Sequence, residues 1–132
     1  MGMYTELNIN VELKDDTPKE VIEILKYMLD NNLTKPELLS HDLFYTDRWE
    51  HMLKGDSYYF DADTHSTLRY GEICESWYLN IQCNLKNYDN EIDKFINFIT
   101  PYVDTDGFWG YKRYEEDDDP TLIYDGSFRT VS

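Results

Sequence analysis

The residues best suited to chemistry in this chain are two aspartates and a histidine at alternate positions. Asp61, Asp63 and His65 follow the apolar run 58–60. Carboxylate and imidazole groups at this spacing could bind a divalent cation together, but metal sites usually take ligands from more than one element, and no second cluster of ligands is evident. A turn whose aspartates bond the local backbone is the simpler interpretation. A metal-binding domain or small enzyme that uses these three residues is the alternative, and we expect no cofactor.

The same segment resembles the nucleophile loop of haloacid-dehalogenase-type phosphatases. Residues 58–64 read Tyr-Tyr-Phe-Asp-Ala-Asp-Thr, an apolar run followed by Asp-x-Asp-Thr. In that family the first aspartate attacks phosphorus and the second handles the leaving-group proton, with Mg²⁺ screening the charges. Here the motif lies mid-chain and is not followed by the alternating strands and helices of a doubly wound sheet. We therefore favour a chain that is not an enzyme.

The charge balance of the chain indicates which kinds of partner it could bind. Twenty-seven Asp and Glu against 12 Lys and Arg give a formal net charge of −15 on 132 residues. This excess disfavours nucleic acids and anionic membranes as direct partners and favours a basic protein. One loop is especially acidic, and it is either a solvated turn or an acidic finger offered to Lys and Arg of a partner. Its carboxylates are Glu115, Glu116, Asp117, Asp118 and Asp119.

The remaining composition points to the cytoplasm. The first residues carry neither a basic nor an apolar segment of the kind found in signal peptides. No stretch approaches the roughly 18 uncharged apolar residues of a membrane-spanning helix. Cys74 and Cys83 form neither a disulfide framework nor a metal-binding pattern. We expect a cytoplasmic protein.

Two strand–helix units, about half the chain apart, predict the fold. Residues 7–14 and 79–86 match at five of eight positions, and apolar and polar residues alternate in both. Such alternation is typical of a strand with one buried face. Apolar stripes at helical spacing follow near 18–31 and 89–100. Two such units, each followed by another strand, indicate an α+β, ferredoxin-like split β-α-β sandwich, with one sheet and two helices on one face.

Connection rules predict how these units assemble. The strands near 4–13 and 77–86 should be parallel neighbours at the centre of the sheet, by the right-handed crossover rule. The buried sheet face and the helical stripes should then meet in one core. We expect this core to contain Leu7, Ile9, Ile24, Met28, Leu79, Ile81, Phe95 and Ile99.

The rest of the chain is assigned to the same single domain, residues 1–132. Residues 33–56 form an inserted segment between the first helix and the second strand. Trp49, Met52 and Leu53 suggest a short helix in this segment, ended by Gly55. The predicted hairpins pair 58–60 with 67–70 and, as an extra C-terminal hairpin, 108–114 with 121–124.

The outward face of the two central strands carries amides and tyrosines. Amides and tyrosines adapt to a partner's hydrogen bonds at low desolvation cost, so this face is either hydrated or a contact surface for a protein or a second copy. RNA-binding domains of this kind place aromatic and basic residues there, whereas amides and acids argue against nucleic acid. The candidate contact residues are Tyr4, Asn8, Asn10, Tyr78, Asn80 and Gln82.

These observations favour a small acidic, non-enzymatic module that binds or inhibits a basic protein partner. Such a protein could occupy a nucleic-acid site as a mimic of DNA. In size and charge the chain resembles bacteriophage-type inhibitors and toxin-neutralising immunity proteins. A homodimeric scaffold, in which acidity serves only solubility, is a further alternative.

Overall fold

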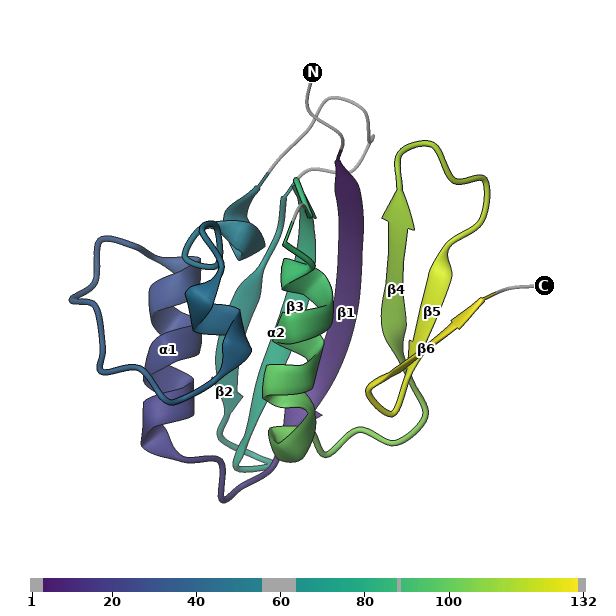
Figure 1. The fold of residues 1–132 in the computed structure, drawn as a ribbon. Helices are drawn as coiled ribbons and strands as arrows, with labels where there is room; N and C mark the ends of the chain where they lie inside the picture. The colour runs from purple at the N-terminus through teal and green to yellow at the C-terminus, as the bar shows by residue number, and fades with distance from the viewer. Residues whose placement is uncertain (1–3, 56–63, 88, 131–132) are drawn as a thin grey trace.

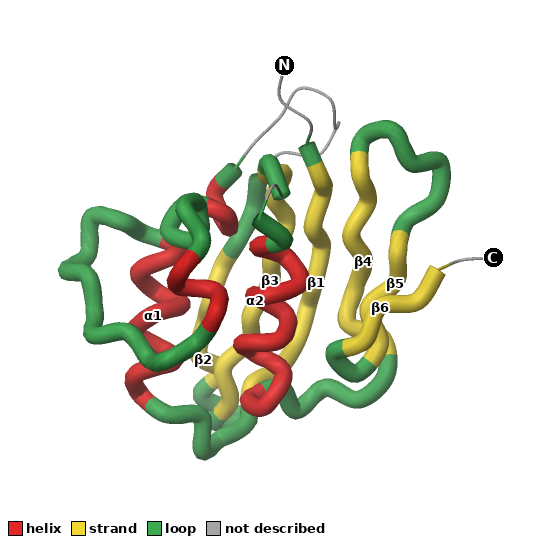
Figure 2. The backbone as a smooth tube through the Cα atoms, viewed as in Figure 1, coloured by secondary structure: helices red, strands yellow, loops and turns green. Residues whose placement is uncertain are grey.

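The computed structural model describes residues 4–55, 64–87 and 89–130 as one open six-stranded antiparallel sheet with two α-helices. The strand order is β2-β3-β1-β4-β5-β6, and both helices lie on the same face of the sheet (Figures 1 and 2). The predicted α+β class is therefore confirmed. The strands are β1 (Thr5–Leu13), β2 (Thr67–Gly71), β3 (Ser76–Leu85), β4 (Phe108–Tyr114), β5 (Thr121–Tyr124) and β6 (Ser127–Thr130). The helices are α1 (Lys19–Leu29) and α2 (Glu91–Ile99), with short 3₁₀ helices at Asp42–Tyr45, Met52–Lys54 and Thr100–Tyr102.

The two central strands are neighbours, but they are antiparallel. Strand β1 pairs with β3 from Thr5↔Leu85 to Leu13↔Trp77. The prediction of parallel neighbours was wrong because it overlooked the hairpin between the two strand–helix units. The crossover through α1 leads to β2, which runs in the direction of β1, and the tight β2–β3 turn then reverses the chain. The returning strand β3 fills the place between β1 and β2.

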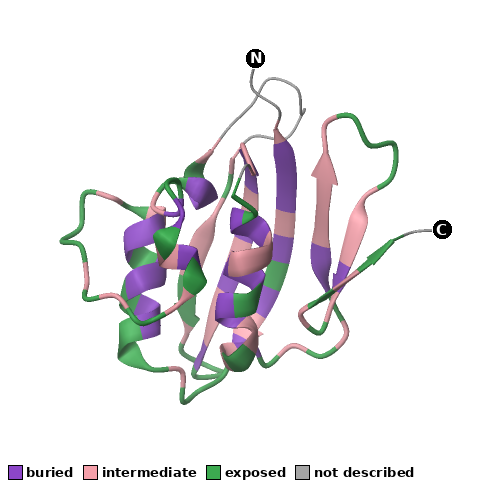
Figure 3. Cartoon of the chain, viewed as in Figure 1, coloured by how far each residue is buried: buried purple, intermediate pink, exposed green. Residues whose placement is uncertain are grey.

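The predicted core is confirmed. Figure 3 shows burial alternating along β1, whose inward residues meet the apolar stripes of the helices. Alternation arises because successive strand side chains point to opposite faces, so one face can be wholly apolar. Each of the eight predicted core residues is at most 1% exposed. The inserted segment adds to this core with Leu43, Trp49, Met52 and Leu53.

The inserted segment covers the helical side of the molecule. The 3₁₀ helix Met52–Lys54 contacts β3 and α1, whereas Asp42–Tyr45 contacts α2. Gly55 follows Met52–Lys54 directly, so the predicted short helix and its end are confirmed in part, with Trp49 in the turn before it. Glycine is required at this position, since a Cβ atom on Gly55 would lie 2.1 Å from the Asn84 carbonyl oxygen.

The C-terminal strands β4, β5 and β6 extend the sheet beyond β1. Strands β4 and β5 have the predicted bounds and pair with each other, and β6 then pairs with β5. Of the other predicted hairpin, residues 58–60 lie outside the described part, and 67–70 belongs to β2, which pairs with β3. No helix within the described residues is long and apolar enough to cross a membrane.

Candidate functional site

The outward face of the sheet has four amides at its centre. Asn8 lies directly opposite Gln82, and Asn10 lies opposite Asn80, so two amide pairs stand side by side on β1 and β3. Asn10 is exposed and the other three side chains are half-buried. Both α-helices and the inserted segment lie on the other face (Figure 1). We call the outward surface of β1 to β6 the open face.

The strand register adds three arginines to the open face, all missed from the sequence. Arg69 on β2 lies opposite Tyr78, and its guanidinium group lies 4.7 Å from the centre of that ring. Arg113 on β4 lies opposite Glu6, with Arg113 Nε 3.8 Å from Glu6 Oε1. Arg129 on β6 lies opposite Leu122, which lies opposite Tyr111, which in turn lies opposite Asn8. Arg129 therefore points to the same face as Asn8. Its guanidinium group lies 4.6 Å from the centre of the Tyr124 ring.

Arginine and lysine are therefore distributed differently over the strands. Within β1 to β6 the outward positions include three of the four arginines of the chain and no lysine. Lys86, directly after β3, lies beside this face, with its Nζ atom 5.7 Å from the centre of the Tyr4 ring. The one strand lysine, Lys112, points to the helical side, where its Nζ atom lies 2.6 Å from Asp93 Oδ1 on α2. Arginine differs from lysine in its planar fork of donors and its ability to stack on aromatic rings. Protein interfaces are correspondingly enriched in arginine and tyrosine and depleted in lysine.

Two tyrosines of this face, Tyr78 and Tyr111, have a raised pKa and are protonated donors at neutral pH. Burial raises the pKa of the Tyr111 phenol, and the neighbouring Glu6 carboxylate raises it further. A hydrogen bond with the Cys74 thiol raises the pKa of Tyr78. Each phenol can therefore offer both an O–H donor and an acceptor oxygen to a partner.

The acidic loop lies between β4 and β5, and one of its five carboxylates has a structural role. The Tyr4 N–H donates to Glu115 Oε1 at 3.1 Å, and the Glu115 N–H donates to the Tyr4 carbonyl at 3.0 Å. Glu115 thus continues the β1–β4 pairing, and Tyr4 lies beside this loop and not among the central amides. The other four carboxylates are exposed at Glu116, Asp117, Asp118 and Asp119.

This difference predicts unequal effects of substitutions in the loop. Glu115→Ala should lower the free energy of unfolding by about 1 kcal/mol, because the Tyr4 N–H loses its acceptor. Neutralising the four exposed carboxylates to Gln and Asn together should leave stability unchanged or slightly higher, because the like charges repel. Urea unfolding followed by circular dichroism measures both effects. Glu116→Ala is the matched control, and an equal loss in both alanine variants would contradict a special role for Glu115.

The three candidate metal ligands lie only partly within the described residues. Asp61 and Asp63 lie outside them, and His65 is exposed, with its backbone N–H donating to the Gln82 carbonyl at 2.7 Å. Among the residues that the structure does describe, no group of three or more His, Cys, Asp or Glu could hold a metal ion.

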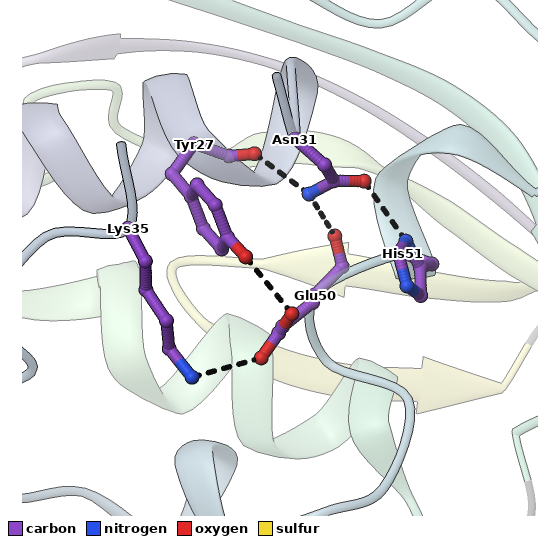
Figure 4. Close-up of polar contacts among 5 residues, drawn as sticks. All are labelled: Tyr27, Asn31, Lys35, Glu50 and His51. Atoms are coloured by element: carbon purple, nitrogen blue, oxygen red, sulfur yellow. Dashed lines mark hydrogen bonds and ion pairs between the residues drawn. The ribbon is translucent and has the colours of Figure 1, made fainter. Parts of the chain in front are cut away.

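A cluster of polar side chains joins α1 to the inserted segment (Figure 4). The Glu50 carboxylate accepts hydrogen bonds from Lys35 Nζ at 3.0 Å and from the Tyr27 hydroxyl at 2.9 Å, and these bonds lower the pKa of Glu50. The bond to Glu50 raises the pKa of Tyr27. Asn31 donates to the carbonyls of Tyr27 and Glu50, while its Oδ1 accepts from His51 Nδ1. These groups anchor the insertion, so we assign the cluster a structural role.

The missed residues left a weak signal in the sequence. Tyr111 and Arg113 alternate in one predicted strand, but alternation alone does not say which face a strand turns outward. Comparison of the chain with protein-family models, curated proteins and solved structures finds no match. The function is therefore inferred from the geometry of the chain itself.

Proposed function

We propose that this protein is a non-enzymatic binding module that contacts a basic protein partner through the open face of its sheet. The observation that carries this proposal is that three arginines, Tyr78, Tyr111 and four central amides share the outward strand positions, none of which is a lysine. Tyrosine and arginine are the residues that most often dominate binding energy at interfaces. Amides supply hydrogen bonds that adapt to the shape of the partner.

The net charge of −15 favours a basic partner over a second copy of the chain. Two copies would bring like charges together, whereas a basic surface would be attracted over a distance set by ionic strength. Many basic protein surfaces are nucleic-acid sites. An acidic module that occupies such a surface would act as an inhibitor and as a mimic of nucleic acid.

The topology of the sheet also allows a more specific assignment of the fold. We propose that β1, α1, β2, β3, α2 and β4 form a ferredoxin-like core. The order β2-β3-β1-β4, with a helix after β1 and another after β3, agrees with a split β-α-β arrangement. Strands β5 and β6 then widen the open face at one edge.

Tyr111→Ala should weaken partner binding at least about tenfold, because Tyr111 lies beside the central amides. The matched control is Tyr45→Ala, since Tyr45 is 83% exposed and belongs to the inserted segment. Each variant and the parent chain would be immobilised and used to capture proteins from cell lysate at low and high salt. Captured proteins would be purified and titrated against all three chains, with thermal melting as the test of folding.

The proposal predicts a protein that the parent and Tyr45→Ala chains retain, that Tyr111→Ala loses, and that salt releases. A partner retained equally by the folded Tyr111→Ala chain would exclude the open face as the contact surface. A purified partner that remains bound at high salt would argue against attraction by charge.

A further inference from the structure

A hollow at one end of the open face has the chemistry of a receptor for a cation. Its volume is about 240 Å³, and its lining includes Asn10, Glu12, Tyr78, Asn80 and Thr105. The strand register places these side chains in two adjacent rows, Asn10 opposite Asn80 and Glu12 opposite Tyr78. Thr105, from the connection between α2 and β4, borders the hollow, and its Oγ1 accepts from the Glu12 N–H at 2.8 Å.

Glu12 brings a carboxylate that forms no ion pair with a described residue, and the nearby Arg69 guanidinium lies over the ring of Tyr78, opposite Glu12. Among the described residues no ion pair involves Glu12, whereas the other glutamate of this face, Glu6, lies beside Arg113. Glu12 is also half-buried, so it is less screened by water than the loop carboxylates. A carboxylate can accept two parallel hydrogen bonds from one guanidinium group.

The amides extend this acceptor set. Asn10 lines the hollow, and because its NH₂ group donates to Asn8 Oδ1 at 3.3 Å, its side-chain carbonyl oxygen can still accept from a ligand. Asn80 lies directly opposite and can offer its own carbonyl oxygen. The Tyr78 phenol, whose pKa is raised, adds a neutral hydroxyl, while the Arg69 guanidinium already lies over its ring.

We propose that this hollow binds an arginine side chain of the basic partner. The inference rests on the proposed function and names the chemistry that the open face recognises. A guanidinium group matches the carboxylate of Glu12 with two N–H donors and has further donors for the amide carbonyls of Asn10 and Asn80. A lysine ammonium group is a compact point charge and would match this spread of acceptors less well.

The test uses three short peptides as probes: acetyl-Gly-Arg-Gly-amide, the lysine analogue, and the citrulline analogue, which has nearly the shape of arginine without its charge. Two-dimensional NMR of the full chain would follow the side-chain NH₂ signals of Asn10 and Asn80. The arginine peptide should shift both signals saturably, the lysine peptide more weakly, and the citrulline peptide should not shift them. Equal shifts with arginine and citrulline would overturn the proposal.

Two variants then distinguish binding of the arginine peptide in the hollow from its general attraction to the acidic chain. Glu12→Gln and Glu116→Gln each remove one negative charge, but only Glu12 lines the hollow. Glu12→Gln should weaken binding of the arginine peptide at least about tenfold, and Glu116→Gln should change it less than about twofold. Equal affinities in both folded variants would refute the arginine site. Because Glu12 donates to Thr105 through its backbone, the variant keeps that contact.

The same variants distinguish failure of the arginine site from failure of the proposed function. A partner that depends on Tyr111 but binds Glu12→Gln normally would refute the hollow and leave the open face as the contact surface. An arginine peptide that binds the hollow, together with a partner indifferent to Tyr111→Ala, would support the site and refute the proposed use of the wider face.

Discussion

Replacing Ile81 by alanine should lower the free energy of unfolding by about 2–5 kcal/mol. Ile81 is 1% exposed and lies at the middle of β3, directly opposite the fully buried Ile9. Truncation removes apolar contact area and leaves a cavity that neighbours on a central strand cannot easily fill. Since domains of this size are stable by only about 5–15 kcal/mol, such a loss would be a large fraction of the total.

Chemical denaturation in urea measures this effect from the shift of the midpoint at constant slope. Gln82→Ala is the matched control, because Gln82 is the next residue of the same strand and faces outward. We expect a loss below about 1 kcal/mol for the control, as for most substitutions away from a core. A loss of similar size for Ile81→Ala would show that the helices do not enclose the centre of the sheet.

Replacing Gly110 by alanine should be at least as damaging, at roughly 3 kcal/mol or more, the combined cost of backbone strain and overpacking. A Cβ atom on Gly110 would lie 1.9 Å from the Asn8 carbonyl oxygen and 2.8 Å from Ile9 Cα. These are backbone atoms of the paired strand β1, so no side-chain rotation relieves the clash. The φ angle of Gly110 is 154°, a value that other residues rarely adopt.

Gly107→Ala separates the two causes. Gly107 also has a positive φ angle, 83°, but nothing lies within 4 Å of the position that its Cβ atom would take. We expect this control to cost only about 1 kcal/mol, the penalty for the backbone conformation. Similar losses of stability in both variants would show that β4 can move away from β1 without penalty.

The Gly110 variant also bears on function. Strand β4 carries Tyr111 and Arg113, and β6 carries Arg129. Both strands, with β5 between them, join the sheet through the pairing of β4 with β1. A shifted β4 would separate these side chains from the central amides. Gly110→Ala should therefore lose partner binding at temperatures where circular dichroism still shows a folded chain, and unchanged binding would contradict a contact surface that spans both halves of the sheet.

Local features of the molecule could be predicted from the sequence because they depend on local periodicity. Alternation in 7–14 and 79–86 identified the two central strands and their buried faces, and the apolar stripes identified both helices. The outward positions follow from the same alternation, so Asn8, Asn10, Asn80 and Gln82 could be recognised as one group. In each case the pattern lies within a few residues of chain.

Features that join distant segments were decided by the tertiary structure. The direction of β3 relative to β1 depends on a hairpin, and the face of Arg69, Arg113 and Arg129 depends on the register of β2, β4, β5 and β6. A shift of one residue in any of these pairings would turn those side chains to the other face. Likewise, Glu115 is distinguished from its acidic neighbours only by Tyr4, 111 residues away along the chain. Register is set by burial and backbone pairing across the whole sheet. The full set of residues on the open face therefore follows only from the pairing of all six strands.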